Sequence, residues 1–101
     1  MRIIPLSGGK YVAVISAVDF RRCNRYSWHV HFSKGKNRKK GAPYARAVID
    51  GKKVYLHRFV TDCPPGYEPD HKNRCTLDCR RENLEIVTRE ENLKRRHKNK
   101  Y

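Results

Sequence analysis

The chain has 101 residues and a mass of 12.0 kDa, which suits one small domain spanning 1–101. Lys and Arg number 24 against 10 Asp and Glu, so the formal net charge is +14. This size excludes a large enzyme with a deep pocket, and no apolar run approaches the roughly 20 residues that a membrane-spanning helix needs. The first ten residues lack the apolar segment of a secretory signal, so we expect the chain to work inside a cell.

Taken in chain order, the first predicted element is a strand over residues 11–15. This run (YVAVI) is rich in β-branched residues and follows a Gly-Gly turn. Ser16 and Asp19 then have the spacing of a weak capping box. The spacing predicts a short helix that ends at about Tyr26.

The next predicted elements complete a small antiparallel sheet. Residues 28–32 alternate Trp, Val and Phe with two histidines, which indicates a half-buried strand with its aromatic face inward. The β-prone runs 44–49 and 53–57 follow a basic loop over 33–42. Asp50-Gly51 lies between these runs and is a strong signal for a two-residue hairpin turn.

The second half of the chain changes character. Residues 56–60 form a short apolar patch, and Cys63-Pro64-Pro65-Gly66 predicts a turn because its two prolines break helices and ladders. A brief extended segment is expected over 67–71, and the polar, Arg-rich residues 72–83 are expected to form a loop.

The C-terminal part predicts a strand followed by a helix. Residues 84–87 contain Leu, Ile and Val, as a short strand would. Thr88 and Glu91 form a clear capping box, so a helix should begin at Arg89 and run toward the chain end. The expected order in this half is therefore strand, long loop, strand, helix.

The excess positive charge favours a polyanionic partner. A sequence pI near 10.1 on a small domain points most often to nucleic acid, with a ribosomal-type RNA binder and an anionic membrane surface as alternatives. The basic residues gather in three clusters, at 34–40, 80–81 and 94–100. Three clusters of positive charge on one small domain predict contacts with phosphate groups. Such contacts supply affinity without choosing a base sequence.

Four polar residues in the second half suggest phosphodiester hydrolysis. Asp70 offers a hard carboxylate oxygen suited to Mg²⁺, and His71 titrates near neutral pH and can accept a proton from water. Asn92, on the first turn of the predicted helix, can present an amide oxygen to the same cation. Taken singly, these residues, and Asn83 before the second strand, are typical of turns and surface hydrogen bonds. Together, in the order strand, loop, strand, helix, they form a specific pattern.

The segments VYLHRFV and DHKNRCTLDCRRENLEIVTREEN resemble the HNH endonucleases, most closely the small homing-type and phage-type members. The resemblance covers residues 54–93. It implies an α+β fold in which a small N-terminal antiparallel sheet precedes a ββα-metal motif ending in a helix. Residues 1–53 would then be a β-rich lead-in that contacts DNA. Residues 54–101 would hold the catalytic core and a basic C-terminal helix.

The resemblance also implies residue roles. His71 would be the general base and Asn83 would bridge the loop and orient it, while Asp70 and Asn92 would bind one Mg²⁺ or Mn²⁺ ion. The basic residues expected at DNA are Arg80, Arg81, Lys39, Lys40, Arg95 and Arg96.

These roles lead to a functional prediction. The chain should be a metal-dependent endonuclease that nicks or cuts double-stranded DNA, as a monomer or a homodimer, in bacterial or phage-infected cytoplasm. The alternative is a catalytically silent nucleic-acid-binding module on the same scaffold.

The cysteines depart from the family pattern, in which positions 75 and 79 are commonly Asn. A chain inside a cell should not rely on disulfides. Two readings stay open: free thiols, or a structural zinc site separate from the catalytic cation. The candidate zinc ligands are Cys63, Cys75, Cys79 and Cys23, with His57 as another possible fourth ligand. His57 is otherwise either a buried histidine bonded to backbone or a side chain near phosphate.

Overall fold

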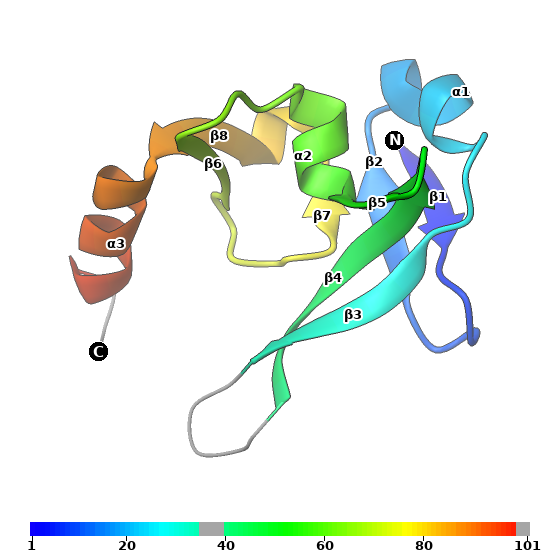
Figure 1. Ribbon diagram of the computed structural model, residues 1–101, viewed down its shortest axis with the longest axis horizontal. Coiled ribbons are helices and arrows are strands. Elements are labelled where there is room, and N and C mark those ends of the chain that lie inside the picture. Colours follow the sequence, from blue (N-terminus) through cyan, green and yellow to red (C-terminus); the bar gives the residue numbers. More distant parts are fainter. Residues whose placement is uncertain (35–39, 99–101) are drawn as a thin grey trace.

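The computed structural model describes residues 1–34 and 40–98, with the side chains of 34, 40 and 96–98 left aside. The described part measures 37 × 29 × 27 Å along its principal axes (Figure 1). It is a mixed α+β structure of three small sheets and short helices. The α+β class is as predicted, but the strands expected to form one antiparallel sheet in the first half belong to two sheets. None of its helices has the length and apolar character to cross a bilayer.

The first sheet joins the N-terminus to a distant loop. Its strands β1 (Arg2–Pro5), β2 (Val12–Ile15) and β7 (Asp78–Cys79) lie in the order β1-β2-β7. β1 is antiparallel to β2, whereas β7 is parallel to it, with Val14 opposite Asp78. The strand expected over 11–15 is confirmed by β2. Neither β1 nor the two-residue β7 was predicted.

The helix predicted from the Ser16 capping box is shorter than expected. A 3₁₀ turn, η1 (Ala17–Asp19), leads into α1 (Phe20–Cys23), which ends before Tyr26. The capping-box prediction is wrong because neither side chain caps this helix. The Ser16 hydroxyl oxygen accepts a 3.0 Å hydrogen bond from the Arg81 backbone N–H instead.

The second sheet contains the predicted hairpin. Its strands are β3 (His29–Lys34), β4 (Lys40–Ile49) and β5 (Lys52–Tyr55), in the order β3-β4-β5. The two residues between β4 and β5, Asp50 and Gly51, have φ values of 51° and 77°. A type I′ turn requires positive φ at both central positions, so the hairpin prediction is confirmed. Figure 1 shows β3 and β4 as a long twisted ribbon that projects from the body.

The strand predicted over 53–57 stops at Tyr55, and a helix follows it. This helix, α2 (Leu56–Thr61), includes His57 and replaces the expected apolar patch. Leu56 and Val60 are four residues apart, so they lie on one face of α2, and both are buried. The residues of α2 have ordinary β propensity. Packing of this face against the core explains why they form a helix.

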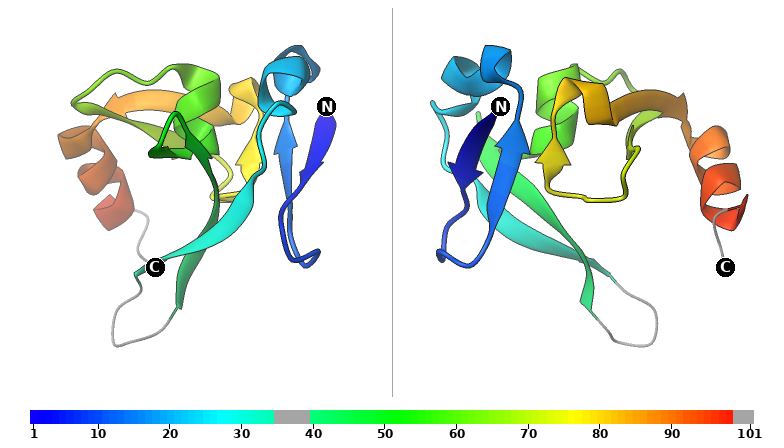
Figure 2. Two further views of the ribbon diagram at one scale, coloured as in Figure 1. Left: turned by 45° about the vertical axis from the view of Figure 1, so that its right-hand side comes forward. Right: turned by 180° about the vertical axis from the view of Figure 1, so that it is seen from behind.

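The second half has the predicted order of elements. β6 (Tyr67–His71) pairs antiparallel with β8 (Leu84–Thr88), and α3 (Arg89–Lys98) follows β8 directly. Between β6 and β8, the loop holds β7 and a 3₁₀ turn, η3 (Arg81–Asn83). Figure 2 shows this unit from two further sides, with α3 at the end of the molecule away from β1.

The capping box at the start of α3 is confirmed. The Thr88 backbone N–H donates to Glu91 Oε1 at 3.2 Å, and the Glu91 N–H donates to Thr88 Oγ1 at 3.1 Å. These reciprocal bonds satisfy two backbone donors at the helix start. They place Asn92 on the first turn of α3.

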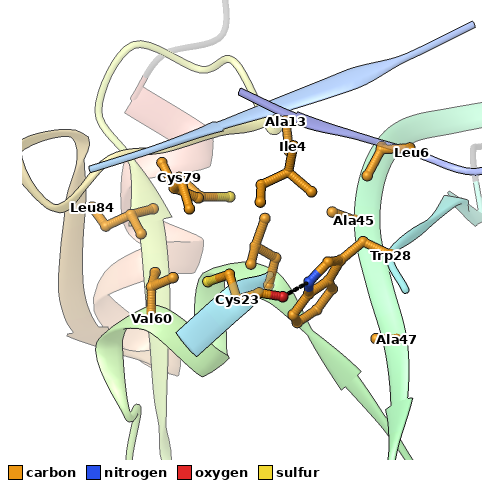
Figure 3. Close-up of a cluster of buried hydrophobic side chains, with 12 residues drawn as sticks. Ile4, Leu6, Ala13, Cys23, Trp28, Ala45, Ala47, Val60, Cys79 and Leu84 are labelled. Atoms are coloured by element: carbon orange, nitrogen blue, oxygen red, sulfur yellow. Dashed lines mark hydrogen bonds between the residues drawn. The ribbon is translucent and has the colours of Figure 1, made fainter. Parts of the chain in front are cut away.

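The hydrophobic core lies mainly between α2 and the two front sheets, β1-β2-β7 and β3-β4-β5 (Figure 3). Trp28 is its largest member, and the indole N–H donates to the Cys23 carbonyl oxygen at 2.9 Å. This bond satisfies the one polar atom that the Trp28 side chain brings into the core. The aromatic residue predicted to face inward therefore anchors β3 to α1.

Candidate active site

The candidate site lies between β6 and α3, which pack against each other. Asp70 and His71 from β6 and Asn92 from α3 border one hollow of about 160 Å³, together with Tyr44 and Arg95. Neighbouring residues on a strand point to opposite faces. Because His71 is the last residue of β6, both it and Asp70 reach this hollow. The structure thus brings together three of the four residues singled out from the sequence.

His71 is almost fully enclosed, with 8% of its surface exposed. Its Nε2 is buried and, within the described ranges, has no hydrogen-bond partner. Burial lowers the pKa of His71 below its ordinary value, while the Asp70 and Asp78 carboxylates act in the opposite direction. A neutral imidazole with an unused ring nitrogen is the form that a general base requires.

His57 packs directly on His71. The two imidazole rings are stacked with centroids 5.2 Å apart and an interplanar angle of 29°. Burial is the main cause that lowers the pKa of His57 to about 3, followed by the nearby His71. The neutral ring of His57 therefore forms one wall behind His71. His57 is half-buried, and its contact here is with a ring and not with backbone.

Asp70 is held by one of its two carboxylate oxygens. Arg95 Nη1 donates to Asp70 Oδ2 at 3.1 Å and to Glu85 Oε2 at 2.9 Å. Asp70 lies opposite Glu85 in the β6–β8 register, so Arg95 spans both strands from α3. No hydrogen bond to Asp70 Oδ1 occurs among the residues that the structure describes. This oxygen is therefore available to a ligand in the hollow.

Asn92 is buried, with 5% of its surface exposed, and its amide is anchored to β6. Its Nδ2 donates to Glu68 Oε1 at 2.7 Å. Glu68 was not predicted from the sequence. The signal that could have found it is its spacing from Asp70, since residues two apart on a strand share a face.

Asn83 organises the loop that follows His71. Its Nδ2 donates to Asn73 Oδ1 and to the Asp78 carbonyl oxygen, both at 2.9 Å, and its Oδ1 accepts from the Asn73 N–H at 3.0 Å. Its own carbonyl oxygen accepts from the Lys72 N–H at 2.8 Å. Asn83 therefore bridges the loop and holds the backbone just after His71. Its side-chain hydrogen bonds go to this loop and not to the imidazole.

Arg80 and Arg81, predicted at DNA, are both engaged within the chain. Arg80 donates from Nε and Nη2 to the two carboxylate oxygens of Asp78, each at 2.8 Å. Arg81 makes the same kind of paired contact with Asp19, at 2.9 and 2.7 Å. Hydrogen bonds from these guanidinium groups lower the pKa of both carboxyls. The arginines thus fix the loop between β6 and β8.

The remaining predicted DNA contacts are only partly described. Arg95 borders the hollow, as given above. Lys39 lies outside the described residues, as do the side chains of Lys40 and Arg96.

The structure does not gather the four cysteines into a zinc site. Cys23 and Cys79 are buried in the core, whereas Cys63 is half-buried and Cys75 is exposed. Burial raises the pKa of Cys23 to about 11 and raises that of Cys79 further, which keeps both as thiols. Within 1–34 and 40–98, no three His, Cys, Asp or Glu side chains are placed to share an ion. The free-thiol reading fits this arrangement.

The hollow fits a hard divalent cation by its chemistry. Mg²⁺ is commonly bound by one or two protein oxygens, with water and substrate phosphate completing the shell. Asp70, which carries carboxylate oxygens, and Asn92, which carries an amide oxygen, both border this hollow. The unpartnered, buried Nε2 of His71 beside them is the kind of polar atom that a ligand or water would satisfy.

Comparison with known proteins gives one match. Residues 54–94 match the HNH endonuclease family. The matched segment begins in β5 and ends in α3, so it contains all of the residues that border the hollow except Tyr44 and Arg95. Neither a search of curated proteins nor a search of solved structures gave a match.

Proposed function

We propose that the chain is a divalent-metal-dependent DNA endonuclease with a ββα-metal centre, because residues 54–94 match the HNH endonuclease family. In this proposal, β6, β8 and α3 are the two strands and the helix of that centre. The observation that carries the proposal is the shared hollow of Asp70, His71 and Asn92, next to a buried imidazole nitrogen without a partner.

His71 acts as the general base. Its burial favours the neutral ring, and the stacked ring of His57 limits its rotation. A neutral imidazole can take the proton from a water molecule that attacks the scissile phosphorus. Asn83 keeps the chain that follows His71 in place through its three side-chain hydrogen bonds.

Asp70 and Asn92 would hold the cation. A divalent cation at this place stabilises negative charge on the scissile phosphate and the leaving oxygen. Arg95 holds the Asp70 carboxylate at its other oxygen, which restricts the rotation of the carboxylate. We propose Mg²⁺ or Mn²⁺ as the ion, since hard oxygen donors suit both.

The proposed substrate is double-stranded DNA. The net charge of +14 on 101 residues favours binding of a polyanion, with phosphate contacts as the main source of affinity. The side chains of Arg80 and Arg81 remain 30% and 55% exposed beside their carboxylate partners. DNA contact at these two arginines, the choice between nicking and cutting, and the monomer or homodimer state remain predictions.

Incubation with supercoiled plasmid tests the proposal. We expect nicked or linear product with Mg²⁺, and none when the ion is chelated. His71→Ala should lower the rate by about 10²- to 10⁴-fold, the usual contribution of general acid–base catalysis. His29→Ala is the matched control because His29 is an exposed histidine on β3, away from the hollow.

Three outcomes would contradict the proposal. Cleavage that survives chelation would exclude the cation, and equal cleavage by His71→Ala would exclude the base. A wild-type protein that shifts DNA in a gel but never cleaves it, with any divalent ion, would favour the silent binding module. The gel shift also shows whether His71→Ala still binds DNA, so that loss of chemistry is separated from loss of binding.

A further inference from the structure

The amide of Asn92 is held between two neighbouring hollows. The hollow of about 160 Å³ contains Asp70 and His71, and a second one, of about 230 Å³, contains Glu68 and His57. Asn92 borders both. Its side chain therefore has a face toward the proposed cation and a face toward Glu68.

The contact with Glu68 decides which end of the amide faces which side. A carboxylate only accepts hydrogen bonds, so the group 2.7 Å from Glu68 Oε1 must be the amide NH₂ and not the amide oxygen. The planar amide then directs Oδ1 away from Glu68. Asn92 is 5% exposed, and no other hydrogen bond of its side chain occurs in the described part of the chain.

We infer that Glu68 is a positioning residue that orients the Asn92 amide so that Oδ1, and not Nδ2, faces the cation. The inference deepens the proposed function and rests on it. With the opposite orientation, two N–H groups would point at a cation, which they cannot coordinate. A hydrogen bond to an ionised partner is about twice as strong as a neutral one, so Glu68 biases the amide strongly.

The placement of Glu68 follows from the fold. β6 presents Glu68 and Asp70 on one face because they are two residues apart, and α3 packs against β6. One strand thus supplies both a ligand and the group that orients the second ligand. Figure 1 shows β6 beside β8, which leads into the base of α3.

Binding of Mn²⁺ to the DNA-free protein tests the inference without relying on cleavage. Glu68→Ala should weaken Mn²⁺ binding by about 10- to 100-fold, the usual effect of removing the partner of a metal ligand. Glu68→Gln should bind nearly as the wild type does, because its amide oxygen can still accept from Nδ2. Glu90→Gln is the charge-matched control: Glu90 is on α3 with its side chain 83% exposed.

In a second pair of variants, replacing Glu68 should strengthen Mn²⁺ binding instead of weakening it. Asn92→Asp places a carboxylate against the Glu68 carboxylate, and the two repel. Adding Glu68→Gln to Asn92→Asp replaces this repulsion with an amide donor, so the double variant should bind Mn²⁺ more tightly than Asn92→Asp alone. If Glu68 only stabilised the fold, Glu68→Gln would not leave Mn²⁺ binding nearly unchanged in the wild type and tighten it in Asn92→Asp.

The outcomes separate the inference from the proposed function. A folded Glu68→Ala protein that binds Mn²⁺ as tightly as the wild type would overturn the inference alone. So would equal binding by Asn92→Asp with and without Glu68→Gln. A wild-type protein that neither binds Mn²⁺ nor cleaves DNA would overturn the proposed function itself. Thermal unfolding of each variant confirms that the fold is intact.

Discussion

The two halves of the chain bury different kinds of side chain. Up to residue 53, the buried residues are apolar except for Asp19, and Trp28 is the largest of them. After residue 53, the buried set includes His71, Asp78, Asn83 and Asn92 beside its apolar members. Buried polar groups destabilise a fold unless they are paired. The first half therefore contributes much of the free energy of unfolding. This stability offsets the cost of burying polar groups in the second half.

The halves are joined by polar contacts as well as by the core. Asp19 and Ser16, which lie just before α1, hold Arg81 in the loop between β6 and β8. The Thr76 hydroxyl, from the same loop, donates to the Pro43 carbonyl oxygen on β4. The loop that follows His71 is thus fixed by residues of the first half. The front sheets act as a support for the site.

The largest effect is expected from the core of the first half. Trp28→Ala removes the largest fully buried side chain and should lower the free energy of unfolding by about 3–5 kcal/mol. Urea unfolding followed by circular dichroism measures this loss. Val18→Ala, at a side chain that is 73% exposed, should change it little. A loss below about 1 kcal/mol for Trp28→Ala would mean that the first half does not carry the stability.

A smaller loss of stability is expected from a change at Asp19, where the two halves meet. Asp19 is 1% exposed and accepts hydrogen bonds from Arg81 and Arg22, so Asp19→Asn should lower the free energy of unfolding by about 2 kcal/mol at pH 7. Arg81 holds the pKa of Asp19 below its ordinary value of 3.8. A carboxyl with a lowered folded pKa stabilises the fold above its unfolded pKa, and this contribution is lost as the pH falls through the folded pKa.

The free energy of unfolding, measured as a function of pH, tests the direction of this effect. The stability difference between wild type and Asp19→Asn should be constant above about pH 5 and should shrink below about pH 4. A difference that grows on acidification would show that the ionised carboxylate does not stabilise the fold. Asp50→Asn, at the β4–β5 turn, is a control outside this network.

Local signals in the sequence predicted the parts of the fold that local chemistry decides. Asp50-Gly51 specifies a hairpin because few residues adopt positive φ at both turn positions. Thr88 and Glu91 specify the start of α3 because each satisfies a backbone N–H of the other. The candidate site followed from the pattern of Asp70, His71 and Asn92, together with the resemblance of residues 54–93 to a family.

The missed features depend on residues far apart in the chain. Ser16 looks like a helix cap until Arg81, 65 positions later, takes its hydroxyl oxygen. β7 has only two residues in a polar loop and exists because β2 offers a parallel edge. The spacing of Glu68 from Asp70 places both on one face of β6, but the contact of Glu68 with Asn92 forms only when α3 packs against β6.

The central claim is that Asp70 and Asn92 share one divalent cation beside His71. Crystals soaked in Mn²⁺ and measured for anomalous scattering test this claim most directly. We predict one anomalous peak within bonding distance of Asp70 Oδ1 and Asn92 Oδ1, in the hollow that the His71 ring also borders. A peak that is absent at saturating Mn²⁺, or that lies only on other side chains, would contradict the claim.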